Sequence, residues 1–181
     1  MNNNDEQVIA QTRKWIIDVV IGCNFCPFAA REIKKDSVHY QVSGTDDPED
    51  AVQQLLHECA RLDKHPVIET GFLIFPATFT EFDDYLDLVS FAENAMIEKG
   101  YEGIYQLASF HPDYIFAGAI ADDAANYTNR SPYPMLHLLR EESIEKVLEK
   151  YPDPEQIPDR NISFAQEKGL AYMKLLRDAC F

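Results

Sequence analysis

The strongest constraint on the fold of this chain is that its hydrophobic pattern alternates between two periods. Apolar residues recur at helical spacing over residues 5–21 and 48–62, whereas residues 67–75 form a nearly continuous apolar run that begins with a β-branched residue. A period of 3.6 residues indicates a helix with one buried face, and a short apolar run indicates a buried strand. A chain that alternates between the two is expected to form a sheet covered by helices.

The whole pattern predicts one mixed sheet and its covering helices. Strands are expected at residues 37–43, 67–75, 104–110 and 135–139. Helices are expected at residues 5–21, from Pro27, from Pro48, and at residues 80–99, 141–151 and 161–179. We therefore predict an α/β (α+β) layer sandwich, in which a mixed sheet of about four strands packs with about five or six helices. Residues 1–181 are expected to form a single globular domain.

The charge of the chain limits its partners. Sixteen Lys and Arg stand against thirty-one Asp and Glu, which gives a formal net charge of −15. A strongly acidic surface repels phosphate backbones and anionic lipids, so we expect neither nucleic acid nor membrane as a partner. A small anionic ligand would need a local cationic pocket. The first residues lack the pattern of a secretory signal, and with four Cys this favours a reducing, cytoplasmic location.

A Cys-x-x-Cys motif, formed by Cys23 and Cys26, follows the first predicted helix. The spacing suits a redox pair or half of a metal site. If Pro27 begins a helix, Cys26 lies at its N-terminal end, where backbone N–H groups and the helix dipole favour the thiolate. Cys26 would then be a nucleophile or redox thiol with Cys23 as its resolving partner. The alternative is that both are small buried residues at a corner between helices.

His111 and Asp113 follow the third predicted strand, where open α/β sheets gather ligand sites. A histidine that titrates near neutral pH beside an aspartate is a candidate general acid or base, or a metal ligand. Pro112 restricts the backbone of His111 to extended geometry. The alternative is an aspartate that caps a turn next to a partly exposed histidine.

A stiff polar loop covers residues 126–134, in which Pro132 and Pro134 flank an aromatic residue. Its candidate ligand-binding side chains, together with one Arg further along, are Asn129, Arg130, Ser131, Tyr133 and Arg140. Hydroxyl and amide donors around a guanidinium can bind a carboxylate or phosphate. In the alternative interpretation the loop is held by its own turns and Arg140 pairs with surface acids.

His137 alternates with Leu136 and Leu138 in the fourth predicted strand, so its side chain should point away from theirs. It is either a histidine on the buried face of the sheet or a ligand. A metal site built from Cys23, Cys26, His111 and His137 would offer donors suited to zinc or iron.

Three separated motifs resemble a bacterial family of about this length that is known as a domain of unknown function, numbered 1415. They are Cys23-Asn-Phe-Cys-Pro-Phe-Ala29, Phe110-His-Pro-Asp-Tyr114 with Phe116-Ala-Gly118, and Thr128-Asn-Arg-Ser-Pro-Tyr-Pro134 with Leu136-His-Leu-Leu-Arg-Glu141. The resemblance covers almost the whole chain, and the motifs occur in order. It implies membership of the family, and no activity, cofactor or catalytic residue comes with it.

The leading functional hypothesis is an enzyme that acts on a small anionic metabolite through a Cys/His/Arg site. In it Cys26 carries the thiol chemistry, His111 moves protons, and Arg130 and Arg140 hold the anion. The alternatives are a protein that binds zinc or iron, and a non-catalytic binding or scaffold domain. A single site requires that Cys26, His111 and Arg130 lie around one pocket at one end of the sheet.

Overall fold

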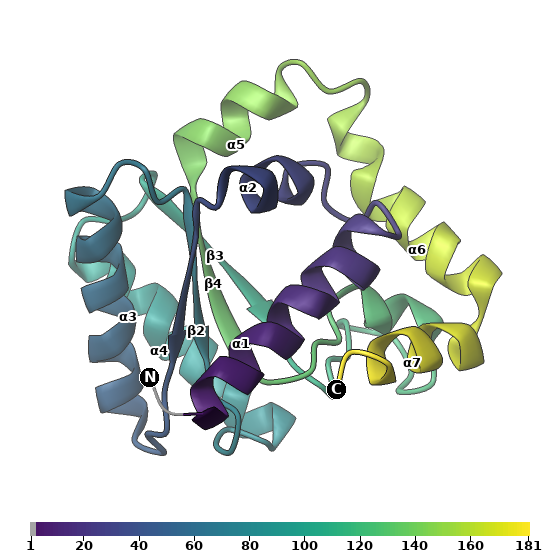
Figure 1. Ribbon diagram of the computed structural model, residues 1–181, viewed down its shortest axis with the longest axis horizontal. Coiled ribbons are helices and arrows are strands. Elements are labelled where there is room, and N and C mark those ends of the chain that lie inside the picture. Colours follow the sequence, from purple (N-terminus) through teal and green to yellow (C-terminus); the bar gives the residue numbers. More distant parts are fainter. Residues whose placement is uncertain (1–2) are drawn as a thin grey trace.

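The four strands form one mixed sheet in which the last strand of the sequence is an interior strand (Figure 1). In the computed structural model, which describes residues 3–181, the strands are β1 (Val38–Val42), β2 (Thr70–Ile74), β3 (Tyr105–Phe110) and β4 (Met135–Arg140). Their order is β1-β2-β4-β3. β1 is parallel to β2, while β4 is antiparallel to both β2 and β3. The predicted four-stranded mixed sheet is confirmed.

Helices cover both faces of the sheet. Within residues 3–181 the α-helices are α1 (Asn3–Trp15), α2 (Ala29–Lys35), α3 (Pro48–Lys64), α4 (Phe82–Glu98), α5 (Glu141–Leu148), α6 (Ile157–Lys168) and α7 (Leu170–Asp178). Shorter helical turns are the π-helix η1 (Ile16–Ile21) and the 3-10 turns η2 (Ala124–Thr128) and η3 (Pro154–Gln156). None of the described helices has the length and apolar character needed to cross a bilayer.

The C-terminal segment corrects the sequence prediction of one helix over residues 161–179. The chain forms two helices there, because Gly169 adopts φ 81° and ψ 158° between α6 and α7. A residue without a Cβ takes this positive φ at little cost, so the glycine ends the first helix and redirects the second. This split accounts for seven α-helices where five or six were expected.

The N-terminal helix changes its hydrogen-bond pattern before it ends. Residues 5–21 were predicted as one helix, and the structure divides them into α1 and the wider turns of η1. The Gly22 amide donates to the carbonyl of Ile17, five residues earlier, at 3.0 Å. A Cβ on Gly22 would lie 2.2 Å from the carbonyl oxygen of Asp18. Glycine is therefore required by a close backbone approach at the end of η1.

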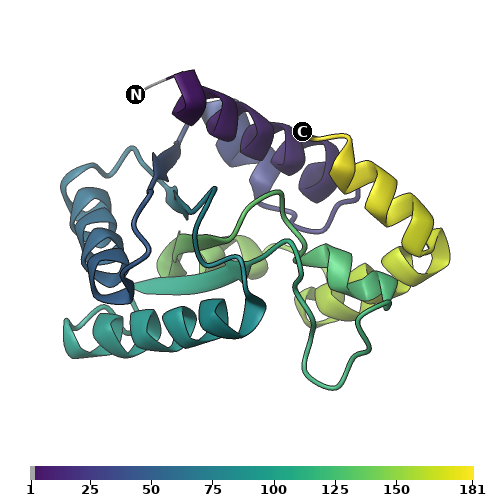
Figure 2. The same ribbon diagram turned by 90° about the horizontal axis from the view of Figure 1, so that it is seen from below.

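Two helix layers enclose two parts of the hydrophobic core (Figure 2). Leu73, Leu136 and Leu138 point from the sheet toward α3 and α4. Phe72 and Met135 point from the other face toward α1 and η1. Helices α6 and α7 lie beside the sheet, where they pack on η1 and η2 (Figure 1).

The start of α3 follows directly from its sequence. The carboxylate of Asp47 accepts hydrogen bonds from the amides of Glu49 at 2.8 Å and Asp50 at 3.2 Å. Pro48 occupies the first turn, where its missing N–H costs nothing. The cap fixes the helix whose buried face covers β2, and the helix predicted from Pro48 is confirmed.

Candidate functional site

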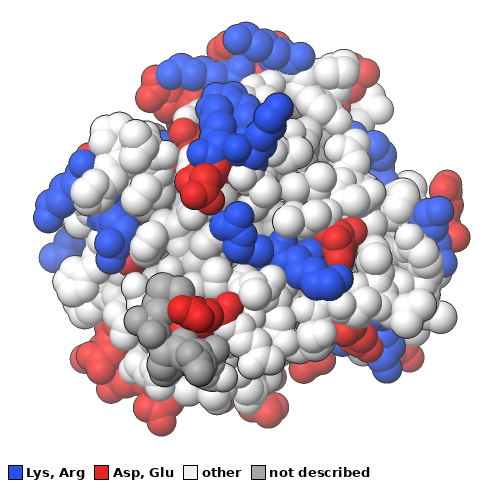
Figure 3. Space-filling view, viewed as in Figure 1, with Lys and Arg blue, Asp and Glu red and all other residues white. Residues whose placement is uncertain are grey.

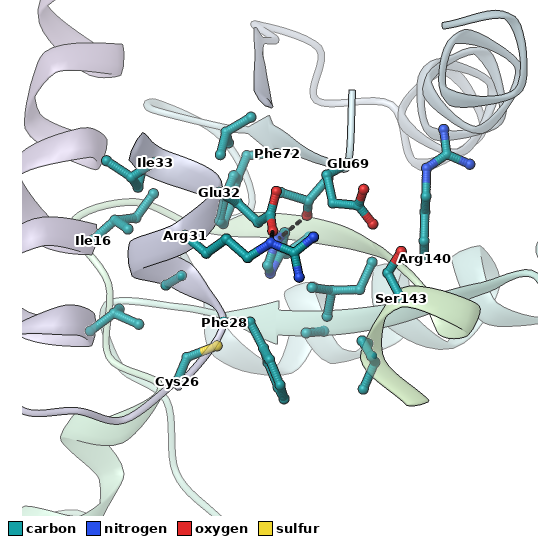
Figure 4. A pocket seen from close by; sticks show the side chains of 18 of the residues that line it. Ile16, Cys26, Phe28, Arg31, Glu32, Ile33, Glu69, Phe72, Arg140 and Ser143 are labelled. Carbon is teal, nitrogen blue, oxygen red and sulfur yellow. Dashed lines mark hydrogen bonds and ion pairs between the residues drawn. The ribbon is translucent and has the colours of Figure 1, made fainter. Parts of the chain in front are cut away.

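A cavity of about 270 Å³ lies between one face of the sheet, η1, α2 and α5 (Figure 4). Most of its lining is apolar, with aromatic walls formed by Trp15, Phe28, Phe72 and Phe110. Trp15 is the one tryptophan of the chain. An apolar cavity with a few convergent polar groups is the usual form of a small-molecule site. This cavity is therefore the candidate site.

Strand alternation decides which polar groups reach the cavity. Thr70, Gln106 and His137 lie on the face of the sheet that forms the cavity floor. Leu136 and Leu138 lie on the opposite face, in the core under α3 and α4. The prediction that His137 points away from its two leucine neighbours is confirmed.

His137 is held on the cavity floor by a stacked ring and one hydrogen bond. Its imidazole lies parallel to the Phe72 ring, with centroids 3.9 Å apart. Its Nε2 is 2.6 Å from Oγ1 of Thr70, and the Thr70 hydroxyl donates to the carbonyl of Leu138. Because the threonine proton is used in this way, Nε2 carries a hydrogen and donates to Oγ1. Nδ1 is then a free acceptor, and it makes no hydrogen bond within residues 3–181.

The histidine is neutral at physiological pH. Burial lowers the pKa of His137 from 6.5 to about 3, because the charged ring would lose its hydration on the apolar floor. The neutral ring offers the lone pair of Nδ1 to a hydrogen-bond donor. His137 therefore gives the cavity floor a hydrogen-bond acceptor without a charge.

Cys26 lines the same cavity. Its sulfur accepts hydrogen bonds from the backbone amides of Phe28 and Ala29, at the start of α2. Nevertheless, burial raises the pKa of the Cys26 thiol, because desolvation of the thiolate outweighs the two amides. The expectation that the helix start would favour the thiolate is corrected. Cys26 is a thiol in this environment.

Cys23 does not line the cavity. It is buried in the core that η1 shares with α6 and α7, and burial raises the pKa of its thiol as well. Both cysteines of the motif are free. The structure therefore separates the surroundings of the two sulfurs, and a role for Cys23 as resolving partner stays a prediction.

His111 is fully buried and both of its ring nitrogens have partners. Nε2 is 3.0 Å from the carbonyl of Phe79, and Nδ1 accepts from the backbone amide of Asp113 at 3.0 Å. Phe79 has φ 53°, so the imidazole holds a loop in the left-handed region. Burial lowers the pKa of His111. Asp113 orients this ring through its main chain rather than through its carboxylate.

Arg130 binds backbone carbonyls of a neighbouring loop. Its Nε donates to Tyr114 at 3.0 Å and its Nη2 to Ala121 at 2.9 Å, while the guanidinium lies over the ring of Tyr127 at 4.9 Å. These contacts support the alternative interpretation of a loop that holds itself. Arg130 does not line the cavity.

The other polar residues of this loop also bond within the protein. The Asn129 amide donates to the carbonyl of Ser109 at 3.1 Å, and the Ser131 hydroxyl donates to the carbonyl of Tyr133 at 2.6 Å. The Tyr133 hydroxyl donates to the side chain of Gln11. The binding role predicted for these residues is not supported by a shared cavity.

Arg140 lies at the rim of the cavity, but its guanidinium is already engaged. Nε and Nη2 donate to the carbonyl of Ile68 at 3.2 and 3.1 Å, and Nη1 donates to the Tyr105 hydroxyl at 3.2 Å. Nη2 also reaches the carbonyl of Leu62. Arg140 ties the end of β4 to the segment before β2, and this occupies every nitrogen of its fork. The expected pairing of Arg140 with surface acids is not observed.

The predicted convergence of Cys26, His111 and Arg130 on one pocket is not found. Of these three, Cys26 lines the cavity, whereas His111 and Arg130 lie beyond the start of β4 and do not line it. Arg130 precedes the start of β4 and Arg140 ends it, and five residue steps along a strand extend about 17 Å. One small anion cannot bridge the two guanidinium groups. The strand predicted at residues 135–139 already implied this separation, because it lies between the two arginines.

The loop motifs nevertheless support the cavity wall. Nε1 of Trp15 donates to the carbonyl of Arg130 at 3.2 Å. The Trp15 ring packs edge-on against Phe110, with centroids 5.1 Å apart. Both aromatic rings line the cavity. The motifs around residues 110 and 130 therefore position two of its walls.

Three charged residues and one serine of the cavity lining were not recognised from the sequence. Arg31 and Glu32 come from α2, Glu69 precedes β2, and Ser143 comes from α5 (Figure 4). In the sequence they resemble ordinary surface charges beside a helix or a strand. The sequence offered one signal for this site. Arg31 and Glu32 follow the Cys-x-x-Cys motif, and Glu69 precedes a buried strand.

The metal interpretation has no preformed group of ligands to support it. Among residues 3–181, no three His, Cys, Asp or Glu side chains lie close enough together to hold a metal ion. His111 lies in the loop after β3 and His137 lies in β4, and only His137 shares the cavity with Cys26.

One family model matches most of the chain. The model described as a protein of unknown function, DUF1415, matches residues 7–175 of the 181. The chain belongs to the DUF1415 family. This confirms the resemblance seen in the three motifs, and the DUF1415 match includes every residue that lines the cavity. No curated protein and no solved structure gives a significant match.

Proposed function

We propose that this DUF1415 protein binds a small, largely apolar metabolite in the cavity on the sheet face. The observation that supports this most directly is His137, a neutral histidine on an apolar floor whose Nδ1 has no partner in the described residues. Nδ1 of His137 is not one of the buried side-chain atoms that lack a partner, so a group in the cavity can reach this acceptor. A hydroxyl, amine or amide donor on a ligand would satisfy it.

The size of the cavity limits the ligand. About 270 Å³ corresponds to about nine liquid waters of ~30 Å³ each. Pockets for drug-sized ligands usually occupy about 300–1,000 Å³. The proposed ligand is therefore a single ring or a short chain with one or two polar groups.

Enzyme activity on such a metabolite is a second candidate, and Cys26 is the observation that favours it. Cys26 and His137 line one cavity, and the amides of Phe28 and Ala29 would stabilise a thiolate once it forms. In such a mechanism Nδ1 of His137 takes the thiol proton while the sulfur adds to a carbonyl carbon of the ligand, and the π electron pair of that carbonyl moves to its oxygen. The pKa values of both groups are unfavourable for this transfer in the empty cavity, so the ligand would have to promote it.

Binding can be measured through Trp15, because it lines the cavity and no other tryptophan contributes to the fluorescence. A series of small aromatic alcohols and acids should change its emission in a saturable manner. Ala108→Leu fills the floor of the cavity and should abolish the change, whereas Ala77→Leu, at an exposed position outside the cavity, should not. If Ala108→Leu remains folded and binds every probe as the wild type does, the cavity is not the binding site.

A further inference from the structure

We infer that the ligand of this cavity is a zwitterion, a small molecule with an apolar body, a carboxylate and a neighbouring protonated amine. The inference rests on the proposed binding function and adds the chemical class of the ligand. It follows from the charged groups at the cavity and from which of them are already engaged within the protein.

The charges that line the cavity balance each other. They are those of two arginines, Arg31 and Arg140, and two glutamates, Glu32 and Glu69, so their formal sum is zero. The chain as a whole carries −15. A simple anion would enter a strongly negative molecule without a net positive charge to receive it. A ligand that carries both signs matches such a site better.

Two of the four charged groups, those of Arg140 and Glu32, have several partners within the protein. Arg140 donates to the carbonyls of Leu62 and Ile68 and to a tyrosine hydroxyl. Glu32 accepts from the Ser37 hydroxyl at 2.7 Å and pairs with Arg31. These contacts hold Arg140 and Glu32 in place at the rim of the cavity. Arg31 and Glu69 remain as the cation and the carboxylate that a ligand can bind.

Arg31 is the available cation. Only its Nε is engaged, at 3.2 Å from Oε1 of Glu32, and neither Nη atom makes a hydrogen bond within the described residues. Its guanidinium extends over the cavity between Glu32 and Ser143 (Figure 4). A fork with two free terminal nitrogens is suited to a carboxylate.

Glu69 is the available carboxylate. Its Oε1 is buried and has no hydrogen-bond partner among the described residues. A desolvated carboxylate oxygen without a donor is unfavourable, and an ammonium group supplies both a donor and an opposite charge. Glu69 and Arg31 both line the cavity (Figure 4), so a carboxylate and an amine on neighbouring atoms can face both groups.

The apolar body of the ligand then occupies the rest of the cavity. Phe28 and Phe72 offer aromatic surface there, and Nδ1 of His137 accepts a donor at the floor. This arrangement describes a free amino acid with an apolar side chain, or a close relative of one.

The test compares four probes that share a phenyl body: phenylalanine, hydrocinnamate, phenethylamine and phenylpropanol. Titration followed by Trp15 fluorescence and by calorimetry should show that phenylalanine binds roughly tenfold more tightly than hydrocinnamate or phenethylamine, since each charge contact adds to the affinity. Hydrocinnamate or phenethylamine binding as tightly as phenylalanine would overturn the inference. Phenylpropanol would still report binding in the cavity, so the proposed function would survive that result. Absence of binding by all four probes would defeat both.

Two variants assign the charges. Arg31→Gln should lower the affinity for phenylalanine to that of phenethylamine, and Glu69→Gln should lower it to that of hydrocinnamate. Neither should change the affinity for phenylpropanol, which also shows that the variants are folded. Lys34→Gln, on the same helix but outside the cavity, and the exposed Glu98→Gln are matched controls that should leave all affinities unchanged. Loss of phenylalanine affinity in the controls but not in Arg31→Gln or Glu69→Gln would contradict the assignment.

Discussion

His137 is the residue whose chemistry is most altered by its surroundings. Its ring is stacked on Phe72 and bonded to Thr70, and burial holds its pKa near 3. The unfolded chain would expose the same ring to water, where its pKa is about 6.5. The difference between the two states makes the stability of the fold depend on pH.

We expect the stabilising effect of neutral His137 to be complete above about pH 6.5 and to decrease as the pH falls toward 3. The unfolded state binds the proton first, so acid favours unfolding. His137→Phe keeps the stack and removes the titration. The free energy of unfolding lost between pH 7 and pH 5 should therefore be roughly 2 kcal/mol smaller in the variant.

Urea unfolding at both pH values measures this difference. The exposed His57→Gln serves as control and should show the pH response of the wild type. If His137→Phe loses as much stability as the wild type on acidification, His137 is not neutral in the folded state.

Cys26 should be the first cysteine to react in the folded protein, but slowly at neutral pH. It is partly buried, whereas Cys23, Cys59 and Cys180 are buried. Because burial raises its pKa above the ordinary 9.0, alkylation by iodoacetamide at pH 7 should be roughly tenfold slower than for an exposed thiol and should rise at alkaline pH.

Mass spectrometry of peptides locates the label. Cys26→Ser should lose the first modification, while all cysteines should react in urea. Fast labelling of Cys26 at pH 7 would mean that the two amides at its sulfur outweigh desolvation, and would strengthen the enzyme candidate.

For single residues, the sequence predicted the direction of a side chain better than it predicted the groups that the side chain contacts. Alternation placed His137 on the correct face, yet only the fold brings the Thr70 hydroxyl to its Nε2. Arg130 shows the limit most clearly. A stiff loop with a guanidinium predicts that the group is fixed, but not whether a ligand or the loop carbonyls fix it. Arg31 and Glu69 line the same cavity from segments far apart in the chain, so no local pattern could identify them.

Among the elements, η1 depends most on a single residue. Gly22 lies against the Asp18 carbonyl because the π-helical turns are wider than those of an α-helix. Ile16 and Val20 of the same element line the cavity. The helical pattern of the sequence predicted the element, but hydrophobic spacing cannot distinguish an α-helix that continues from one that widens.

Gly22→Ala should destabilise the protein by about 1–3 kcal/mol, because the new methyl group forces the end of η1 to move. Thermal or urea unfolding measures the loss. Gly44→Ala is the control, since nothing lies within 4 Å of a Cβ at that position, and its effect should stay within about 0.5 kcal/mol. Equal effects of the two substitutions would show that the close approach at Gly22 relaxes without cost.

For the whole molecule, the excess of acids is not uniform over the surface. Lys and Arg side chains gather over α1 and α2 on the face seen in Figure 3. Acidic side chains are exposed elsewhere, for example along α4, where Asp87 and Glu93 lie. Repulsion among the carboxylates is stronger there. The composition predicted a repulsive surface but not where the positive charges lie.

Salt should stabilise this protein. Raising the NaCl concentration from about 0.01 to 0.15 M shortens the screening length from about 30 to 8 Å and weakens repulsion among the acids. We expect the Tm to rise by a few degrees, roughly 2–4 °C for each kcal/mol gained. The double variant Asp87→Asn and Glu93→Gln should respond less than the wild type. A Tm that falls with salt would show that ion pairs matter more than net repulsion.

The interior position of β4 has a consequence for how the protein is made. A ribosome releases β2 and β3 long before it releases Met135–Arg140, so the nascent chain carries two strands whose facing edges have no partner. Exposed edges of this kind pair readily with other chains. The strand that closes the sheet also carries His137. Completion of the backbone pairing and completion of the cavity floor are therefore one event.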